Sequence, residues 1–330
     1  MEADTTPEIL RVSEQRVQKV LSRLNPGKAC GPDRIPNWLM KKYSDAVAFP
    51  VTEILNASYS EQHLPRMWKL ADVTPLPKKK SVAEGFIVDD YVKPAVMSII
   101  DDSQYGAIPN SSTTMALISM LHNWSINTDG NGVTVRTILF DYQKAFDFID
   151  HEILIRRLRT KCKLPVSITN WIVGFLSDRL QRIKLAAECF SEWGSVPSGV
   201  PQGTKWGPWL FVLMINDLEI AYPLWKYVDD TTASEMVPKE SESHVQNIAD
   251  CVIEWSRENS VHLNSDKYKE PRISFSKRPG FFDPIVIEGK ELEVVDSVKL
   301  LGLHIASDLT WNSHISEVII KASKRLYLYD

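Results

Sequence analysis

The chain has 330 residues, of which 44% are apolar and 24% are charged, and 38 basic against 42 acidic residues give a formal net charge of −4. This composition is typical of a folded globular protein and argues against a mainly disordered chain. It also excludes a protein that coats nucleic acid through an overall positive charge, so nucleic-acid binding would have to depend on local basic clusters.

Two further classes of protein are excluded by cysteine spacing and hydropathy. The four cysteines lie far apart without a CxxC pair, so a zinc finger or ribbon is not expected. The longest apolar run, Trp209–Ile215, has seven residues, whereas a membrane helix needs about 20. The N-terminal MEADTTPEIL is acidic and unlike a secretory signal. We therefore expect an intracellular protein, with nucleus or cytoplasm left open.

The first predicted element is an amphipathic helix over residues 14–24, with Ser13 as its N-cap. Its apolar face carries Val17, Val20, Leu21 and Leu24. The loop KACGPDRIP follows, and a second apolar stretch runs through Leu55. The proline-rich, basic segment ADVTPLPKKK favours an extended strand or loop.

The middle of the chain predicts a buried strand from Val133 to Phe140, which ends at Asp141. A helix is expected to begin near Asp150, and residues 165–176 and 209–215 predict two more. In the helix after Asp150, the residues expected to point inward are Ile153, Leu154 and Leu158, and those expected to point outward are Arg156, Arg157 and Arg159.

The last third predicts a hairpin, a helix and several short strands. Leu224–Val228 and Thr231–Ala233 flank Asp229 and Asp230 at a hairpin tip. The remaining predictions are a helix over 248–255, strands over 272–276, 284–287 and 298–305, and a basic helix from Trp311. Strict alternation of strands and helices is absent, which favours an α+β fold: an antiparallel sheet with helices on one face.

Carboxylates at strand ends are the first candidates for a site. Asp141 directly follows a buried strand, and either caps a turn or faces a cleft. Asp229 and Asp230 repel each other and need solvent or a cation nearby. The pair itself is not specific, because Asp89-Asp90 and Asp101-Asp102 also occur.

Three blocks in a fixed order give the last pair its context: FDYQKAFDFIDH (140–151), SGVPQGTKWGPWLF (198–211) and KYVDD (226–230). Together they resemble the reverse transcriptases of non-LTR (LINE-type) retrotransposons of the jockey-like group. Weaker flanking blocks resemble that family too: KACGPDRIPNWLMK, MWKLADVTPLPKK, QYGAIPNSST, WSRENSVHLNSDK and KLLGLHIASDLTWNSH. The resemblance extends from about residue 14 to the end.

This resemblance implies a right-hand polymerase with fingers, an antiparallel-sheet palm and a truncated thumb. Residues 1–130 would form an N-terminal extension and fingers, shortened near 80–104, where the Arg-Pro-Ile-Ser block of the family is missing. Residues 131–295 would form the palm, with an inserted fingers-side helical segment near 165–200. Residues 296–330 would begin an incomplete thumb.

The resemblance also assigns the site. Asp141, Asp229 and Asp230 match the catalytic aspartates, which would hold two Mg²⁺ ions, with Mn²⁺ as a substitute. Two ions about 4 Å apart suit nucleotidyl transfer, and Mg²⁺ prefers oxygen ligands. The nucleotide-binding matches are Phe146, which would exclude a ribose 2′-hydroxyl, Gln202 and Gly203 in the loop under the template base, and Lys267 near the pyrophosphate. Leu301-Gly302 resembles the primer grip.

The implied function is RNA-directed DNA polymerase activity on an RNA template, with a DNA primer or an RNA/DNA hybrid and deoxynucleoside triphosphates, and without a membrane. Two basic clusters could bind phosphates or be solvated surface: Lys78, Lys79 and Lys80, and Arg156, Arg157, Arg159, Lys161 and Lys163. One alternative is a catalytically impaired, domesticated or eroded palm domain that only binds nucleic acid. Another is an RNA-templated RNA polymerase, against which Phe146 argues.

Overall fold

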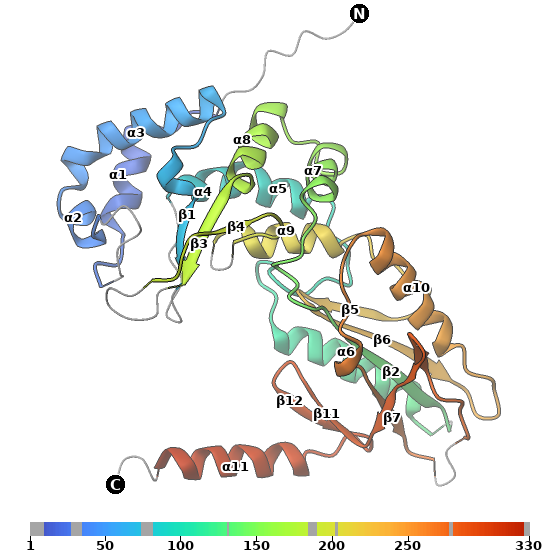
Figure 1. Ribbon diagram of the computed structural model, residues 1–330. Coiled ribbons are helices and arrows are strands. Elements are labelled where there is room, and N and C mark those ends of the chain that lie inside the picture. The colour runs from blue at the N-terminus through green and yellow to red at the C-terminus, as the bar shows by residue number, and fades with distance from the viewer. Residues whose placement is uncertain are drawn as a thin grey trace, which may run out of the picture. The chain divides into compact units, whose positions relative to one another are not determined.

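Figure 1 shows a computed structural model of the chain, which describes residues 10–27, 35–73, 82–130, 132–183, 190–201, 204–276 and 280–326. The chain divides into two compact units, each built from two separate stretches of sequence. The first unit comprises Met1–Ile100 and Ala145–Met214, and the second comprises Asp101–Lys144 and Ile215–Asp330. Within the described residues, no helix is both long enough and apolar enough to span a membrane.

The first unit is mainly helical. Its elements are α1 (Glu14–Ser22), α2 (Asn37–Lys42), α3 (Ser44–Glu61), η1 (Arg66–Lys69), β1 (Leu70–Val73), α4 (Val82–Ile87), the π-helical η2 (Val88–Val92), α5 (Lys93–Met97), α7 (His151–Thr160), α8 (Val166–Leu176), β3 (Arg179–Ile183), β4 (Gly194–Val196) and α9 (Trp206–Ile215), whose last residue begins the second unit. β3 pairs in parallel with β1 and antiparallel with β4.

The predicted first helix is confirmed. The Ser13 side chain accepts a hydrogen bond from the Arg16 amide at the start of α1, and Val17 and Leu21 are buried. The helices expected after Asp150, over 165–176 and over 209–215 are confirmed as α7, α8 and α9. Their shared apolar packing includes the stacked rings of Trp171 and Trp206, with centroids 6.1 Å apart.

One predicted orientation in α7 is wrong. Arg157 is 5% exposed, and its guanidinium donates hydrogen bonds to the carbonyls of Leu213 (3.0 Å) and Met214 near the end of α9. Carbonyls in the last turn of a helix lack internal partners, and a buried arginine can satisfy them. Arg157 is therefore not part of an exposed basic cluster. The other predicted members are exposed: Arg156, Arg159, Lys161 and Lys163. Lys78, Lys79 and Lys80 lie outside the described residues.

The second unit is built on a five-stranded sheet. Its elements are α6 (Thr113–Thr128), β2 (Thr134–Asp141), β5 (Leu224–Tyr227), β6 (Asp230–Val237), α10 (Val245–Glu258), η3 (Ser265–Lys267), β7 (Lys269–Ser274), β8 (Val286–Ile287), β9 (Lys290–Glu291), β10 (Glu293–Val295), β11 (Ser297–Leu300), β12 (Leu303–Ala306) and α11 (Asn312–Leu326). The strand order is β10-β7-β2-β6-β5, antiparallel except for the β10–β7 pair. The α+β prediction is confirmed.

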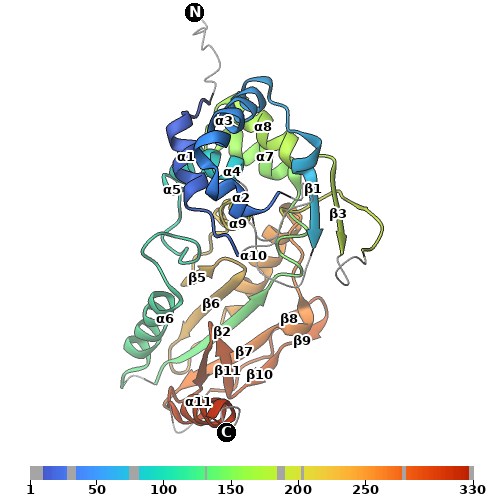
Figure 2. The same ribbon diagram turned by 90° about the vertical axis from the view of Figure 1, so that its left-hand side faces the viewer.

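Helices cover both faces of this sheet, and the expectation of helices on one face is wrong (Figure 2). On one face, Trp124 of α6 packs with Val135 and Trp225. On the other face, Val252 of α10 packs with Ile138. The physical reason lies in β2 and β6, which are buried at nearly every position rather than at alternate ones.

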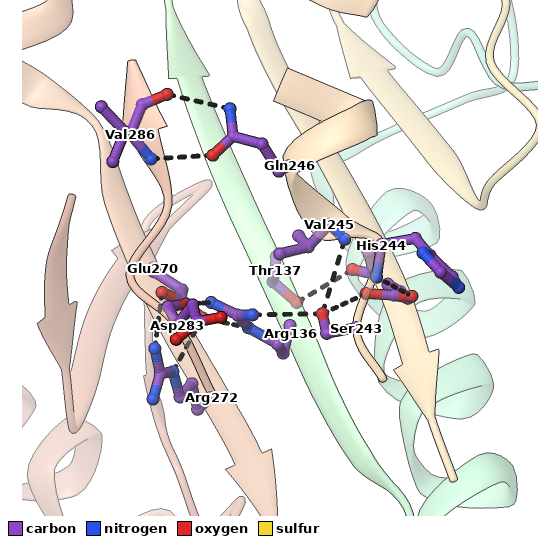
Figure 3. Close-up of polar contacts among 12 residues, drawn as sticks. Arg136, Thr137, Ser243, His244, Val245, Gln246, Glu270, Arg272, Asp283 and Val286 are labelled. Carbon is purple, nitrogen blue, oxygen red and sulfur yellow. Dashed lines mark hydrogen bonds and ion pairs between the residues drawn. The ribbon is translucent and has the colours of Figure 1, made fainter. Parts of the chain in front are cut away.

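A buried polar network ties the central strands together (Figure 3). Arg136 of β2 donates to Glu270 of β7 at 2.6 Å, to the Ser243 hydroxyl at 3.1 Å and to the Asp283 carbonyl at 2.9 Å. Arg272 donates twice to the same Glu270 carboxylate, at 2.7 and 3.0 Å. Since Arg136 and Glu270 are almost fully buried, each depends on the other for its charge to be tolerated.

Replacing Glu270 by Gln should lower the free energy of unfolding by about 3–5 kcal/mol, because the buried Arg136 charge loses its partner. Urea unfolding at pH 7 measures this loss. The control is Glu240→Gln, which breaks the well-exposed Lys239–Glu240 pair and should cost less than about 0.5 kcal/mol. An equal, small effect of both substitutions would contradict the structural role given to the buried pair.

Candidate active site

Three aspartates lie close together where the pairing between β2 and β6 ends. Asp141 is the last residue of β2 and Asp230 the first of β6, and the antiparallel register sets them directly opposite each other. Asp230 also pairs with Tyr227 of β5, so that Val228 and Asp229 form a two-residue turn. Directly opposed residues project from the same face of a sheet, so the carboxyl groups of Asp141 and Asp230 are neighbours.

The turn that carries Asp229 has an unusual backbone. Val228 lies in the left-handed region with φ 56°, which is rare for a β-branched residue. Such a conformation costs about 1–3 kcal/mol and persists only where the surroundings enforce it. The position of Asp229 is therefore set by a strained residue.

The carboxyl groups of the turn hold their protons more tightly than free aspartates do. Partial burial raises the pKa of Asp229, and the charge of Asp141 raises it further. Partial burial, Asp229 and Asp141 together raise the pKa of Asp230 to about 6. Lys267 opposes both shifts. Burial is the largest cause of both shifts, and the neighbouring carboxylates add to it, so that the charged forms of Asp229 and Asp230 are disfavoured.

Asp141 has two partners from the segment before β7. The Lys267 ammonium lies 3.1 Å from its Oδ2, and the Asn264 side-chain amide donates to the same oxygen at 3.2 Å. The Asn264 backbone amide also donates to the Asp141 carbonyl at 2.8 Å. The structure thus brings the predicted Lys267 to the aspartates and adds Asn264, which the sequence analysis did not single out.

The donor set suits a hard divalent cation in its chemistry, because carboxylate oxygens are the ligands that Mg²⁺ prefers. Within the described ranges, no group of three or more His, Cys, Asp or Glu side chains is arranged so that it could hold a metal ion as it stands. Among the described residues, the Lys267 ammonium forms an ion pair with Asp141.

The other predicted residues fall in the first unit. Phe146 packs against Phe211, with ring centroids 5.2 Å apart. The first two sequence blocks meet there, because the Val200 amide donates to the Phe146 carbonyl at 2.8 Å and the Gly199 amide donates to the Ile149 carbonyl at 2.9 Å. Gln202 and Gly203 lie outside the described residues. The nucleotide-binding roles of these residues stay predictions.

Comparison with known proteins adds independent findings. A family model described as "Reverse transcriptase (RNA-dependent DNA polymerase)" matches residues 86–305. The RNA-directed DNA polymerase from mobile element jockey of Drosophila melanogaster is 22% identical over 93% of this chain and 36% of its own length. The probable RNA-directed DNA polymerase from transposon X-element of the same species is 22% identical over 92% of this chain and 36% of its own length. The chain spans about a third of the length of these relatives.

Similar solved structures include telomerases of two Candida species. Apo telomerase from Candida tropicalis matches 84% of this chain and 43% of its own, with a TM-score of 0.45 and 12% identity. Telomerase from Candida albicans in complex with a fragment of telomeric RNA matches 82% of this chain and 39% of its own, with a TM-score of 0.41 and 13% identity.

The raised pKa of Asp230 predicts how stability depends on pH. Above pH 6 the carboxylate is charged in the folded and unfolded states, and folding is disfavoured because the folded state holds the charge less well. As the pH falls from about 6 towards 3.8, the folded state takes up the proton first, and this penalty disappears.

Asp230→Asn should therefore stabilise the protein at pH 7 by about 1 kcal/mol, a value reduced from the full shift because solvent screens the partly exposed side chain. The gain should vanish near pH 3.8. Urea unfolding at both pH values measures it, with the exposed Asp250→Asn as control. A variant less stable than wild type at pH 7 would contradict the claim that burial and the neighbouring carboxylates make the charged form of Asp230 unfavourable.

Proposed function

Because the chain belongs to the reverse transcriptase (RNA-dependent DNA polymerase) family, we propose that it copies RNA into DNA by nucleotidyl transfer at Asp141, Asp229 and Asp230. Membership confirms the resemblance seen in the three sequence blocks. The observation that carries the proposal is the register pair Asp141–Asp230, with Asp229 in the adjoining turn. This pairing brings carboxyl groups from the first and the third sequence block next to each other.

The three carboxylates would hold two divalent ions, Mg²⁺ or Mn²⁺. Bound there, the ions would activate the primer 3′-hydroxyl and stabilise the charge that develops on the phosphorus oxygens. Asn264 orients the Asp141 carboxylate through its side-chain amide. Lys267, whose side chain is 63% exposed, keeps an ammonium within 3.1 Å of Asp141, where it can neutralise or protonate a leaving pyrophosphate.

The substrates in this proposal are an RNA template, a DNA primer or an RNA/DNA hybrid, and deoxynucleoside triphosphates. Phe146 would select the deoxynucleotides, because a phenyl ring beneath the sugar leaves no room for a 2′-hydroxyl. The sheet β10-β7-β2-β6-β5 with α6 and α10 would be the palm, and α11 would belong to the thumb. Residues 1–100 would contribute the N-terminal extension and most of the fingers. This proposal moves the expected boundary from residue 130 to residue 100, because Asp101–Lys144 belong to the second unit.

Primer extension on an RNA template tests the proposal directly. The wild-type chain should add deoxynucleotides with Mg²⁺, lose this activity on chelation of the metal and regain it with Mg²⁺ or Mn²⁺. Asp141→Asn should lower the rate at least about 10³-fold, because it removes a ligand that acts in the transition state.

The matched control is Asp250→Asn, since this exposed aspartate of α10 bonds only to Gln246 among the described residues. It should leave the rate unchanged. Salt-dependent binding of the template–primer without any nucleotide addition by the wild-type chain would overturn the proposal and favour a domain that only binds nucleic acid.

Sugar selection gives a second test. Phe146→Val should raise the incorporation of ribonucleotides relative to deoxynucleotides by about 10–100-fold, since a smaller side chain relieves the steric exclusion. The control is Phe211→Leu, which disturbs the same ring contact without changing Phe146. It should keep the preference for deoxynucleotides. An unchanged preference in Phe146→Val would show that the ring is only part of the core.

A further inference from the structure

A segment from much earlier in the chain lies along β5, the edge strand that leads to Asp229. Gln104 pairs with Lys226 in a parallel bridge. The Lys226 amide donates to the Ser103 carbonyl at 2.8 Å, and the Tyr105 amide donates to the Lys226 carbonyl at 2.7 Å. Both backbone polar groups of Lys226 are thus held by this segment, immediately before the strained turn.

Gly106 lies directly against the Val228–Asp229 turn. A Cβ atom placed on Gly106 would lie 2.3 Å from the Val228 backbone nitrogen and 2.7 Å from the Tyr227 carbonyl carbon. Real Cβ atoms do not approach backbone this closely, so no other residue fits without moving the turn. The Gln104 side-chain oxygen accepts the Gly106 amide at 2.9 Å and fixes the glycine in this place.

The Lys226 side chain anchors the same strand from inside the unit. It is fully buried, and its ammonium donates to the carbonyls of Ile215 (3.3 Å), Asn216 (3.2 Å) and Leu218 (3.0 Å). Asp101 lies 3.5 Å from the ammonium, and the Asp101 amide donates to the Asn216 side chain at 2.9 Å. Residues 101–106, β5 and the turn at 215–218 therefore form one network.

We infer that residues 101–106 form a clamp that positions the Val228–Asp229 turn, and that Gly106 and Lys226 are positioning residues for the carboxylates of Asp229 and Asp230. The clamp explains why Val228 keeps a left-handed backbone, because Gly106 on one side and the Tyr227–Asp230 pair on the other leave it no alternative. Its catalytic consequence rests on the proposed function: a displacement of about 1 Å at reacting groups can cost about 100-fold in rate.

The decisive variant is Gly106→Ala. It should lower kcat for nucleotide addition by about 100-fold while the KM for deoxynucleotide and the Kd for template–primer stay within about twofold, because binding surfaces are not displaced. Amide hydrogen exchange at residues 227–230 should rise about tenfold, and that of 134–140 should not change.

The control is Gly289→Ala, at the turn between β8 and β9. Unlike Gly106, Gly289 has a left-handed backbone, with φ 77°, and a Cβ there meets nothing within 4 Å. This control is therefore the more demanding substitution for the backbone, but it produces no collision. It should keep the wild-type kcat and wild-type exchange at 227–230.

Two further variants test whether position, rather than folding, is lost. Lys226→Met keeps the length of the side chain but removes the ammonium, and should give the same pattern as Gly106→Ala. In the Gly106→Ala protein, a Val228 side-chain carbon would lie 2.6 Å from the new Cβ. Adding Val228→Gly removes this carbon and allows the turn to move. The double variant should therefore have a kcat about tenfold higher than Gly106→Ala alone.

The outcomes separate the clamp from the proposed function. A folded Gly106→Ala protein with wild-type kcat and wild-type exchange at 227–230 would overturn the clamp, as would a loss of kcat fully explained by weaker template–primer binding. A wild-type chain that adds no nucleotide, but whose exchange at 227–230 responds to Gly106→Ala, would overturn the proposed function and support the clamp.

Discussion

The register between β2 and β6 is the constraint on which the site depends. It runs without interruption from Thr134–Val237 to Asp141–Asp230. A slip of one residue would turn every side chain of one strand to the opposite face and separate the carboxylates. Polar pairs inside the sheet prevent this slip: the hydroxyls of Thr137 and Ser234 bond at 2.9 Å in register.

The polar groups that fix the register lie away from the carboxylates themselves. The Trp124 indole nitrogen donates to the Ser234 hydroxyl at 3.0 Å, which joins α6 to β6. On the other face, Arg136 joins β2 to β7 through Glu270. Because these buried groups are satisfied only in one pairing, an error of register would leave them without partners and cost stability. The sheet can therefore hold three mutually repelling carboxyl groups where the pairing of β2 with β6 ends.

The sequence predicts those elements whose burial is periodic or whose turns are marked by composition. The strand ending at Asp141, the hairpin around Asp229 and the helices α1, α7, α8, α10 and α11 were all recognisable in this way. Helix α6 was not predicted, because it carries no acidic or basic residue in its terminal turns and exposes Met115, Ile118 and Ile126 alongside its buried face. Because α6 has no clear separation of a polar and an apolar face, the sequence did not predict that helices cover both faces of the sheet.

The sequence predicted those site residues that belong to motifs occurring in a fixed order along the chain. The aspartates were found because three blocks occur together, whereas Asn264 bonds to Asp141 across 123 positions and belongs to a residue type common in turns. Arg157 and Lys226 are further cases: a basic residue in a helix or strand predicts exposure, and only the tertiary structure supplies the carbonyl groups that justify its burial. The role of Gly106 likewise depends on a contact with backbone from a distant segment.

The central claim, that Asp141 and Asp230 are direct cross-strand neighbours, can be tested by disulfide trapping. In a chain whose native cysteines are replaced by serine, Asp141→Cys combined with Asp230→Cys should oxidise readily, because opposed residues of antiparallel strands have Cα atoms about 4.5–5.5 Å apart. Asp141→Cys combined with Thr231→Cys should not, since Thr231 pairs with Phe140 and faces the other side. Crosslinking of the second pair in preference to the first would contradict the register and the site built on it.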